Sequence, residues 1–256
     1  MATHLIAYQQ SVDQATPAAI NTVVDDVITR TGTTRFLVPE DYRFVHWAAA
    51  LGPSLTRAYL VSPSLEVRRF RGEIVPHQRG SESFDLAKLT IYKPVVPLEL
   101  TATEELEAHV AEDGTGATQV DVLVALGAGE LPSAPSGDLR LVRATGTTTL
   151  SPRTWTTVSV TMELSLEPGE YSLVAFLPIS ATAIAARALF VGQVYRPGVP
   201  ALAGTEAVAR EFESGYLGEH QFYEMGRFTH LTVPQFQFFA SAADTSETVL
   251  MWVVKL

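Results

Sequence analysis

Histidine is the residue type in this sequence best suited to metal binding and to proton transfer near neutral pH. The chain has six histidines: His4, His46, His77, His109, His220 and His230. No two of them have the H-x-H or H-E-x-x-H spacing that brings two imidazoles to one metal ion. Cysteine is absent, so the sequence has no thiolate ligand, disulfide or cysteine nucleophile. We therefore expect no metal and no cofactor, and we expect His46 to be a satisfied core or rim histidine; a cupin-like site built from distant histidines is the alternative.

Three carboxylates share one face of an expected long strand, Glu99, Glu105 and Glu107. A retaining glycosidase needs two carboxylates that face each other across a cleft. Glutamates that follow one another on the outer face of a strand are instead typical of a solvated surface. We therefore expect no catalytic role for them.

Motifs for phosphate binding and for nucleophilic catalysis are also absent from the sequence. No glycine precedes a lysine, so there is no P-loop, and there is no G-x-S-x-G elbow or S-x-x-K pair. Gly114-Thr115-Gly116 and Gly127-Ala128-Gly129 lack the third glycine of a dinucleotide site and are expected to be turns. The sequence predicts that the protein is not an enzyme.

Aromatic side chains gather in a long irregular region, residues 192–229, as Tyr216, Phe222, Tyr223 and Phe228. A connection of this length inside a compact domain usually has a function or a partner. Three interpretations stay open: a lid on the core, a subunit interface, where aromatic residues are enriched, or a platform on which sugars stack.

The elements that must position these residues begin with an expected helix near the N-terminus. Thr16 suits the N-cap, Pro17 the first helical position and Gly32 the C-terminal stop. The apolar stripe between them has helical spacing: Ile20, Val23, Val24, Val27 and Ile28. This stripe is expected to dock either on the chain's own sandwich or on a neighbouring subunit, so its residues are candidate interface residues. If it lies at an interface, replacing Val23 and Val27 with Asp blocks assembly and leaves the strands intact.

Strict alternation of apolar and polar residues from Val96 to Val110 predicts a long strand with one buried face. Only Glu104 interrupts the apolar row. A short helix over residues 103–112 is the competing interpretation, because acidic residues favour a first helical turn.

Residues 155–164 and 171–177 are expected to form an antiparallel hairpin around a turn at residues 167–170. Residues 171–177 and 248–256 are apolar on both faces, which predicts central strands. With roughly a dozen expected strands and no visible repeat, the chain has too few for two eight-stranded jelly rolls. We therefore expect an N-terminal arm and helix over residues 1–32 and one elaborated antiparallel β-sandwich, of jelly-roll type, over residues 33–256.

Composition limits the possible partners. The 256 residues carry a net charge of −10, and only 18% of them are charged. The sequence has no basic arm, so strong direct binding to nucleic acid is not expected. No apolar run reaches the roughly 18 residues of a membrane span, and Met1–Gln10 has no signal-peptide pattern, so we expect a soluble protein without Sec-type export. One asparagine and an excess of arginine over lysine fit a thermophilic source or a GC-rich genome.

Together these features resemble the jelly-roll capsid proteins of icosahedral viruses. The resemblance lies in a helix before a long antiparallel run, the low charge and hairpin-like segments at residues 145–155 and 166–171. It implies a structural coat subunit that forms homo-oligomers, contacts other capsid proteins, is assembled in the host cytoplasm and resides in the virion. Coats of single-stranded RNA viruses have a basic arm that this sequence lacks, so a DNA virus is the expected source. A carbohydrate-binding β-sandwich that uses the loop aromatics is the alternative function, in a soluble intracellular protein.

Overall fold

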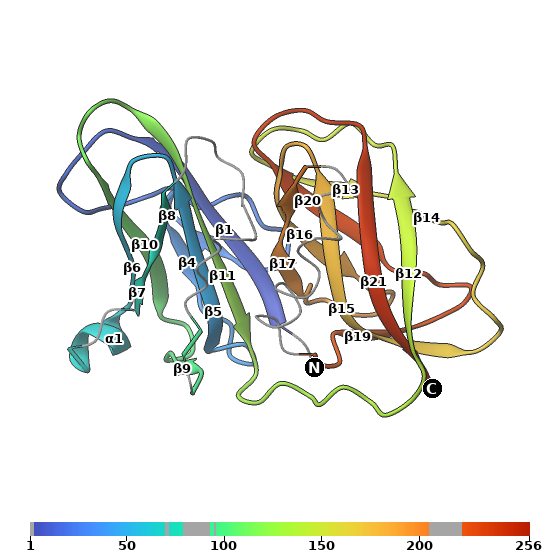
Figure 1. The fold of residues 1–256 in the computed structure, drawn as a ribbon. Helices are drawn as coiled ribbons and strands as arrows, with labels where there is room; N and C mark the ends of the chain where they lie inside the picture. Colours follow the sequence, from blue (N-terminus) through green and yellow to red (C-terminus); the bar gives the residue numbers. More distant parts are fainter. Residues whose placement is uncertain (1–2, 70–71, 79–92, 95, 205–221) are drawn as a thin grey trace. The chain divides into compact units, whose positions relative to one another are not determined.

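The fold is almost entirely β-structure. A computed structural model describes residues 3–69, 72–78, 93–94, 96–204 and 222–256 (Figure 1). Within these residues the only helix is α1 (Pro63–Val67), whose N-cap Ser62 accepts a hydrogen bond from the backbone of Leu65. The predicted all-β class is confirmed, and the strand pairs are antiparallel except for one short parallel pair in each half of the chain.

Contacts between residues divide the chain into two compact units. The N-terminal unit comprises Leu5–Glu82 and Lys88–Glu130, and the C-terminal unit comprises Leu131–Leu256 together with the described residues Thr3 and His4. Strand β1 (Thr3–Val12) therefore begins in one unit and continues in the other. The single domain expected over residues 33–256 stays a prediction.

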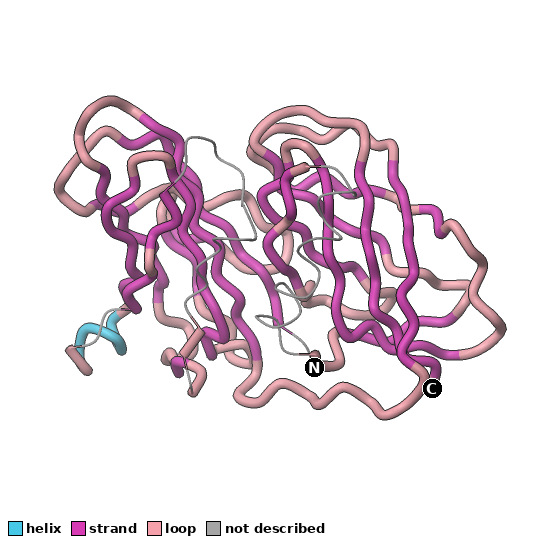
Figure 2. The backbone as a smooth tube through the Cα atoms, viewed as in Figure 1, coloured by secondary structure: helices cyan, strands magenta, loops and turns pink. Residues whose placement is uncertain are grey.

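The N-terminal unit contains two sheets (Figure 2). The first has the order β1-β11-β5-β8, and β9 also pairs with β5. Its strands besides β1 are β5 (Phe44–Gly52), β8 (Pro76–Gln78), β9 (Leu98–Glu99) and β11 (Thr118–Gly127). The second has the order β3-β4-β10-β6-β7, and β2 also pairs with β10. Its strands are β2 (Ala18–Ala19), β3 (Arg30–Thr31), β4 (Arg35–Leu37), β6 (Leu55–Val61), β7 (Gly72–Ile74) and β10 (Glu105–Glu112).

Apolar side chains from both sheets form the core of this unit. Tyr8 of β1 packs edge-on against Phe36 of β4, with ring centroids 5.1 Å apart. The Tyr8 hydroxyl donates a 2.8 Å hydrogen bond to the Leu106 carbonyl of β10, so its polar end is satisfied. Burial raises the pKa of Tyr8 well above its ordinary value.

The C-terminal unit also contains two sheets. The first has the order β14-β12-β21-β15-β18, and β19 also pairs with β15. Its strands are β12 (Leu139–Gly146), β14 (Thr161–Met162), β15 (Glu170–Ser180), β18 (Leu202–Ala203), β19 (Gly226–Thr229) and β21 (Glu247–Lys255). The second has the order β13-β20-β16-β17. Its strands are β13 (Trp155–Val158), β16 (Ala183–Leu189), β17 (Gly198–Pro200) and β20 (Gln235–Ala240). Phe176 of the first sheet meets Phe236 of the second in the core, with centroids 5.1 Å apart.

The two units share one topology. Eight principal strands of each unit, numbered 1 to 8 in chain order, give one sheet of order 1-8-3-6 and one of order 2-7-4-5. They are β1, β4, β5, β6, β7, β8, β10 and β11 in the N-terminal unit and β12, β13, β15, β16, β17, β18, β20 and β21 in the C-terminal unit. The pairing of the third strand recurs as well, because β5 or β15 takes a short parallel partner, principal strand 6 (β8 or β18), and a short antiparallel partner outside this numbering (β9 or β19). The expectation that the chain has too few strands for two eight-stranded units was wrong, because several strands are only two to four residues long.

The predicted helix over residues 16–32 is wrong. This segment contains the short strands β2 and β3 and no helix, and its backbone hydrogen-bonds to one strand of each sheet of the N-terminal unit. The Ile20 N–H donates to the Ala108 carbonyl of β10 at 3.0 Å. The Val23 N–H donates to the Ala7 carbonyl of β1 at 2.9 Å. Every residue of the proposed stripe is β-branched, which restricts χ1 in a helix and favours extended backbone.

The long strand predicted from Val96 to Val110 is two strands, β9 and β10, which belong to different sheets. The chain crosses between the sheets at residues 100–104, where Thr103 has a φ of 64°. Glu104, the residue that interrupts the apolar row, accepts hydrogen bonds at this corner from the Thr101 N–H and from both the N–H and the hydroxyl of Ser64. The strand interpretation of residues 105–112 is confirmed.

The expected hairpin of residues 155–164 with 171–177 is also wrong. β13 pairs with β20, and β15 pairs with β21, β18 and β19. The turn after Glu167 thus connects strands that are not neighbours. The central position predicted for residues 171–177 and 248–256 is confirmed, because β21 lies between β12 and β15 and both strands are buried along most of their length.

Candidate interaction site

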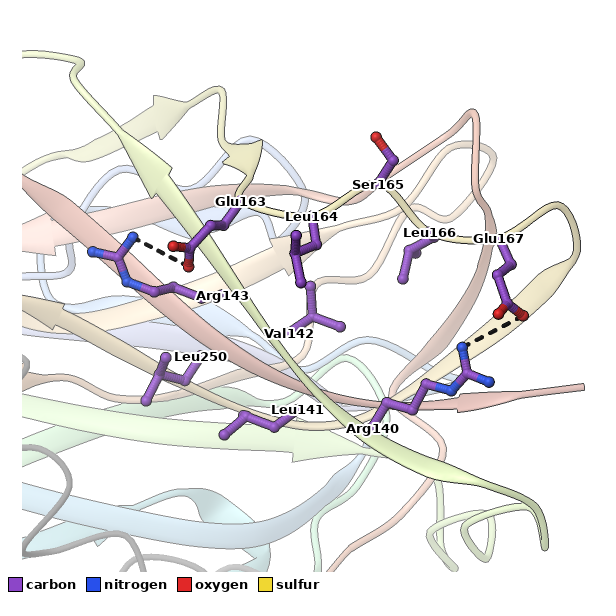
Figure 3. Close-up of a pocket in the computed structure, with 10 residues that line it drawn as sticks. All are labelled: Arg140, Leu141, Val142, Arg143, Glu163, Leu164, Ser165, Leu166, Glu167 and Leu250. Atoms are coloured by element: carbon purple, nitrogen blue, oxygen red, sulfur yellow. Dashed lines mark ion pairs between the residues drawn. The ribbon is translucent and has the colours of Figure 1, made fainter.

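A groove opens at one edge of the C-terminal unit, between β12 and residues 163–167 (Figure 3). Its volume is about 650 Å³. Leu141 and Val142 of β12 and Leu250 of β21 form one wall, and Leu164 and Leu166 lie on the other.

The groove exists because β14 ends after two residues. β14 pairs with β12 at Ala144 and Thr145, and one more backbone hydrogen bond follows, from the Glu163 N–H to the Arg143 carbonyl at 3.0 Å. Along the rest of β12, the described residues include no ladder partner on this side. After residues 163–167 the chain turns away from β12 at Pro168-Gly169. Proline has no N–H to donate to a neighbouring strand, and Gly169 has a φ of 154°.

Two ion pairs connect the walls at the two ends of the groove (Figure 3). Arg143 lies 3.7 Å from Glu163, and Arg140 lies 3.5 Å from Glu167. Glu167 also accepts a 2.8 Å hydrogen bond from Lys255. The hydrogen bond and charge of Lys255, followed by the charge of Arg140, lower the pKa of Glu167. Exposed pairs of this kind add little to stability, but they fix arginine on one wall and glutamate on the other.

Leucines make the groove edge unusually apolar for a water-exposed surface. Leu139 and Leu141 are each 50% exposed, and Leu164 is 76% exposed. The groove thus combines apolar side chains, a strand edge and charges of both signs. These features suit the binding of another polypeptide better than catalysis.

A second polar cluster covers the outer face of β4, β6 and β10 in the N-terminal unit. Arg35 contacts Glu105 at 2.7 Å and Glu107 at 2.5 Å. His109 contacts Glu107 at 2.8 Å and stacks on Tyr59. Burial acts to raise the pKa of Glu107, but hydrogen bonds from His109 and Arg35 outweigh it, and the net shift is downward. Of the three carboxylates expected on one face, Glu105 and Glu107 are held in this cluster. The expectation was wrong for Glu99, which lies in β9 of the other sheet and pairs with Arg43.

Each unit also buries a carboxylate where the seventh and eighth principal strands meet. Glu247 begins β21, is 1% exposed, and neither carboxylate oxygen has a hydrogen-bond partner. Burial, followed by the negative charge of Asp244, raises the pKa of Glu247 to about 7. Glu112 ends β10, and burial raises its pKa even though one oxygen accepts a hydrogen bond from the Thr118 hydroxyl.

Arg187 is a fully buried cation that the sequence reasoning missed. Its Nε donates to the side-chain oxygen of Gln237 at 2.7 Å, and its guanidinium lies 4.2 Å from the centre of the Trp155 ring. His4 contacts it at 3.3 Å. The available signal was an arginine inside an otherwise apolar strand, Ala183–Leu189.

The candidate interface residues of the N-terminal segment have different environments. Ile20, Val23 and Ile28 are buried in the N-terminal unit, Val27 is partly buried, and Val24 is 63% exposed. The segment therefore docks on the chain's own sandwich through three of its five apolar residues. The interface role of this set stays a prediction, and Val24 is its one exposed member.

The candidate aromatic residues lie mainly in the core. Tyr223 and Phe228 are buried, and Phe222 is partly buried against the core of the C-terminal unit. Burial raises the pKa of Tyr223 to about 12, and its hydroxyl lies 3.1 Å from the Thr3 hydroxyl. Tyr216 lies outside the described residues. The three described rings fit the core-lid interpretation better than a sugar platform.

His46 is satisfied, as predicted. Its Nε2 lies 2.6 Å from the Ala128 carbonyl, and burial lowers its pKa. Among the described residues, no group of three or more histidine or acidic side chains is placed to hold a metal ion. A helix long and apolar enough to cross a membrane is likewise absent from the described part of the chain.

Comparisons with known proteins add one similarity. No protein-family model matches the chain, and a search of curated proteins found no match. A search of solved structures found similarity to the crystal structure of the major capsid protein P2 from Bacteriophage PM2, with 11% sequence identity over 94% of this chain and 98% of that chain. The TM-score is 0.25, which is too low for the superposition to support an argument about function.

Proposed function

We propose that this protein is a structural, self-assembling coat subunit of an icosahedral virus and not an enzyme. The observation that carries the proposal is the repeated strand order, 1-8-3-6 facing 2-7-4-5, in both units. This is the order of an eight-stranded jelly roll, a fold used by viral capsid proteins, lectins and cupins. Fold alone does not define function, so the surface features must select among these classes.

Surface features favour the coat among the three classes. The groove offers an apolar strand edge with charges of both signs, which suits contact with another polypeptide. The described aromatic candidates are at least partly buried, which argues against the carbohydrate-binding alternative. A cupin requires clustered metal ligands, and the described residues contain no such cluster.

The proposal extends to the kind of virus and to the partners. A net charge of −10 leaves this chain poorly suited to condensing nucleic acid directly. We therefore propose the coat of a DNA virus whose genome is packaged by other components, assembled in the host cytoplasm with other capsid proteins. Self-assembly requires contacts that each bury more than about 1,000 Å².

Size-exclusion chromatography with light scattering, followed by negative-stain microscopy, tests this proposal. We expect trimers, pentamers, hexamers or closed shells whose abundance rises with protein concentration. A protein that stays monomeric at all accessible concentrations would contradict self-assembly. In that case glycan arrays and metal analysis of the purified protein would test the other two classes.

A further inference from the structure

Glu247 begins β21 at the point where this strand meets the end of β12. Its backbone pairs with Gly146, which is the last residue pair between the two strands. A Cβ on Gly146 would lie 3.3 Å from a carboxylate oxygen of Glu247 and would clash with Val158 of the second sheet. The acidic side chain therefore lies inside the sandwich, in space that the missing side chain of Gly146 leaves open. Neither carboxylate oxygen has a hydrogen-bond partner among the described residues.

Next to Glu247 the chain forms a corner that one aspartate holds together. We name residues 147–150 and 241–246 the Asp244 corner. The Asp244 carbonyl accepts a 2.8 Å hydrogen bond from the Leu150 N–H. Its carboxylate accepts from the Ser180 hydroxyl at 2.6 Å and from the Ala181 N–H at 2.9 Å, which attaches the corner to the end of β15. Leu150 is 1% exposed and belongs to the core of the C-terminal unit.

The surroundings of Glu247 disfavour its ionised form. Burial acts to raise the pKa of Asp244, but hydrogen bonds from a hydroxyl and from backbone N–H groups outweigh it, so Asp244 is charged at neutral pH. No other neighbour offsets this charge, because β12 contributes Gly146, β13 contributes Val158, and residues 147–149 are threonines. Burial, followed by the charge of Asp244, raises the pKa of Glu247 to about 7, and nearby backbone groups oppose this shift more weakly.

An ionised Glu247 has a short route to water. It is the first residue of its strand, and the two residues before it are exposed. Breaking the pairing with Gly146 lets the carboxylate turn outward, while the rest of β21 stays paired with β12 and β15. Asp244 lies in the same segment and moves with it, so the hydrogen bond that holds the Leu150 N–H is lost.

We propose that Glu247 is a proton-dependent latch on the Asp244 corner. When protonated, it stays between the sheets and the corner is closed. When ionised, it turns to solvent, opens the corner and uncovers Leu150. Between the ordinary pKa of 4.5 and about 7, each unit of pH raises the population of the open corner on the order of tenfold, and the population levels off above that range. The latch is a property of the C-terminal unit and is independent of the proposed coat function.

Hydrogen–deuterium exchange with mass spectrometry, at pH 5.5 and pH 8 and corrected for the intrinsic effect of pH, tests the latch in the full chain. In the wild type we expect protection of the Asp244 corner to fall on the order of tenfold at pH 8, whereas β16 keeps its protection. Glu247→Gln keeps the shape of the side chain without its charge, so we expect its corner to stay protected at both pH values. Glu163→Gln removes an exposed carboxylate and should behave as the wild type does.

A thiol label provides a second measurement that does not depend on exchange. The chain has no cysteine of its own, so Leu150→Cys places a single thiol in the corner. We expect its labelling, compared with that of a small free thiol at the same pH, to accelerate on the order of tenfold from pH 5.5 to pH 8. Adding Glu247→Gln should abolish this acceleration.

The possible results of these experiments are distinct. A loss of protection at pH 8 that is confined to the corner and absent from Glu247→Gln supports the latch. Unchanged protection in the wild type overturns it. An equal loss in the wild type and in Glu247→Gln assigns the response to another group and also overturns it. A loss that extends to β16 indicates unfolding of the whole unit, which contradicts a local latch.

Discussion

At the scale of single residues, buried charge is what distinguishes this protein from a simple β-sandwich. Arg187 keeps its charge inside the C-terminal unit by contacting Gln237 and the face of Trp155. Glu247 has no comparable partner, because both of its oxygens are buried without a hydrogen bond. Removal from water favours the neutral acid. Arg187 is therefore stabilised as a cation by its contacts, whereas Glu247 is stabilised by taking up a proton.

Glu247 makes the stability of the protein depend on pH. Its pKa is about 7 in the folded protein, against an ordinary value of 4.5. Between these two pH values the folded state holds more protons than the unfolded state, so the free energy of unfolding falls as pH rises and levels off above pH 7. Glu247 accounts for at most about 3 kcal/mol of this loss.

Glu247→Gln removes that titration, and we therefore expect a more stable protein at pH 8 and a flatter profile from pH 4.5 to 7. Urea denaturation at pH 5 and pH 8 measures both effects. Glu163→Gln, an exposed carboxylate, is the control and should leave the profile unchanged. Parallel profiles for the wild type and Glu247→Gln would contradict the burial of an unpaired carboxylate.

At the scale of elements, the sequence predicted strands better than it predicted their partners. Alternation identified β10, and two-sided apolar character identified β15 and β21 as central. Partners depend on residues far apart in the chain, which explains why the expected hairpin of residues 155–164 with 171–177 failed. The false helix over residues 16–32 has a local cause, since spacing was weighed above the β-branched identity of the residues.

Neighbouring valines in that segment provide a direct check. Val23 is 3% exposed and Val24 is 63% exposed. We expect Val23→Asp to lower the free energy of unfolding by about 3 kcal/mol or more, because it buries an unpaired charge. Val24→Asp should change it by less than about 0.5 kcal/mol. Chemical denaturation of both variants measures the difference, and equal stabilities would favour the helix interpretation.

The short strand β19 completes the first sheet of the C-terminal unit, and its close packing can be tested. A Cβ on Gly226 would lie 2.6 Å from the Phe190 ring. We expect Gly226→Ala to destabilise the protein by about 1–3 kcal/mol, because the ring must move.

Gly129→Ala is the matched control, since its added Cβ would meet the Phe44 ring at an ordinary 3.5 Å. The midpoint of urea denaturation measures both variants. Equal midpoints would indicate that β19 is not packed as described.

At the scale of the whole molecule, a repeated topology is present without a repeated sequence motif. The third strand in each unit has the same set of partners, yet one is Phe44–Gly52 and the other Glu170–Ser180. A sandwich of β-sheets requires only alternating burial and turns, which many sequences satisfy. The all-β class could therefore be predicted from the residues, whereas the recurrence of the strand order in the two units and the groove at β12 could not. The groove depends on where β14 ends, a property of pairing that the sequence pattern does not encode.

Strand β1 has a consequence for the order in which the molecule is made. Thr3 contacts Tyr223, 220 positions later, and the imidazole of His4 accepts from the backbone N–H of Arg196, 192 positions later. During synthesis the start of β1 is therefore exposed long before its partners leave the ribosome, while its continuation can already pair with β11. Contacts between such distant residues form slowly. The contacts of the first residues therefore form among the last steps of folding. A polypeptide truncated before Tyr223 lacks the partner of Thr3.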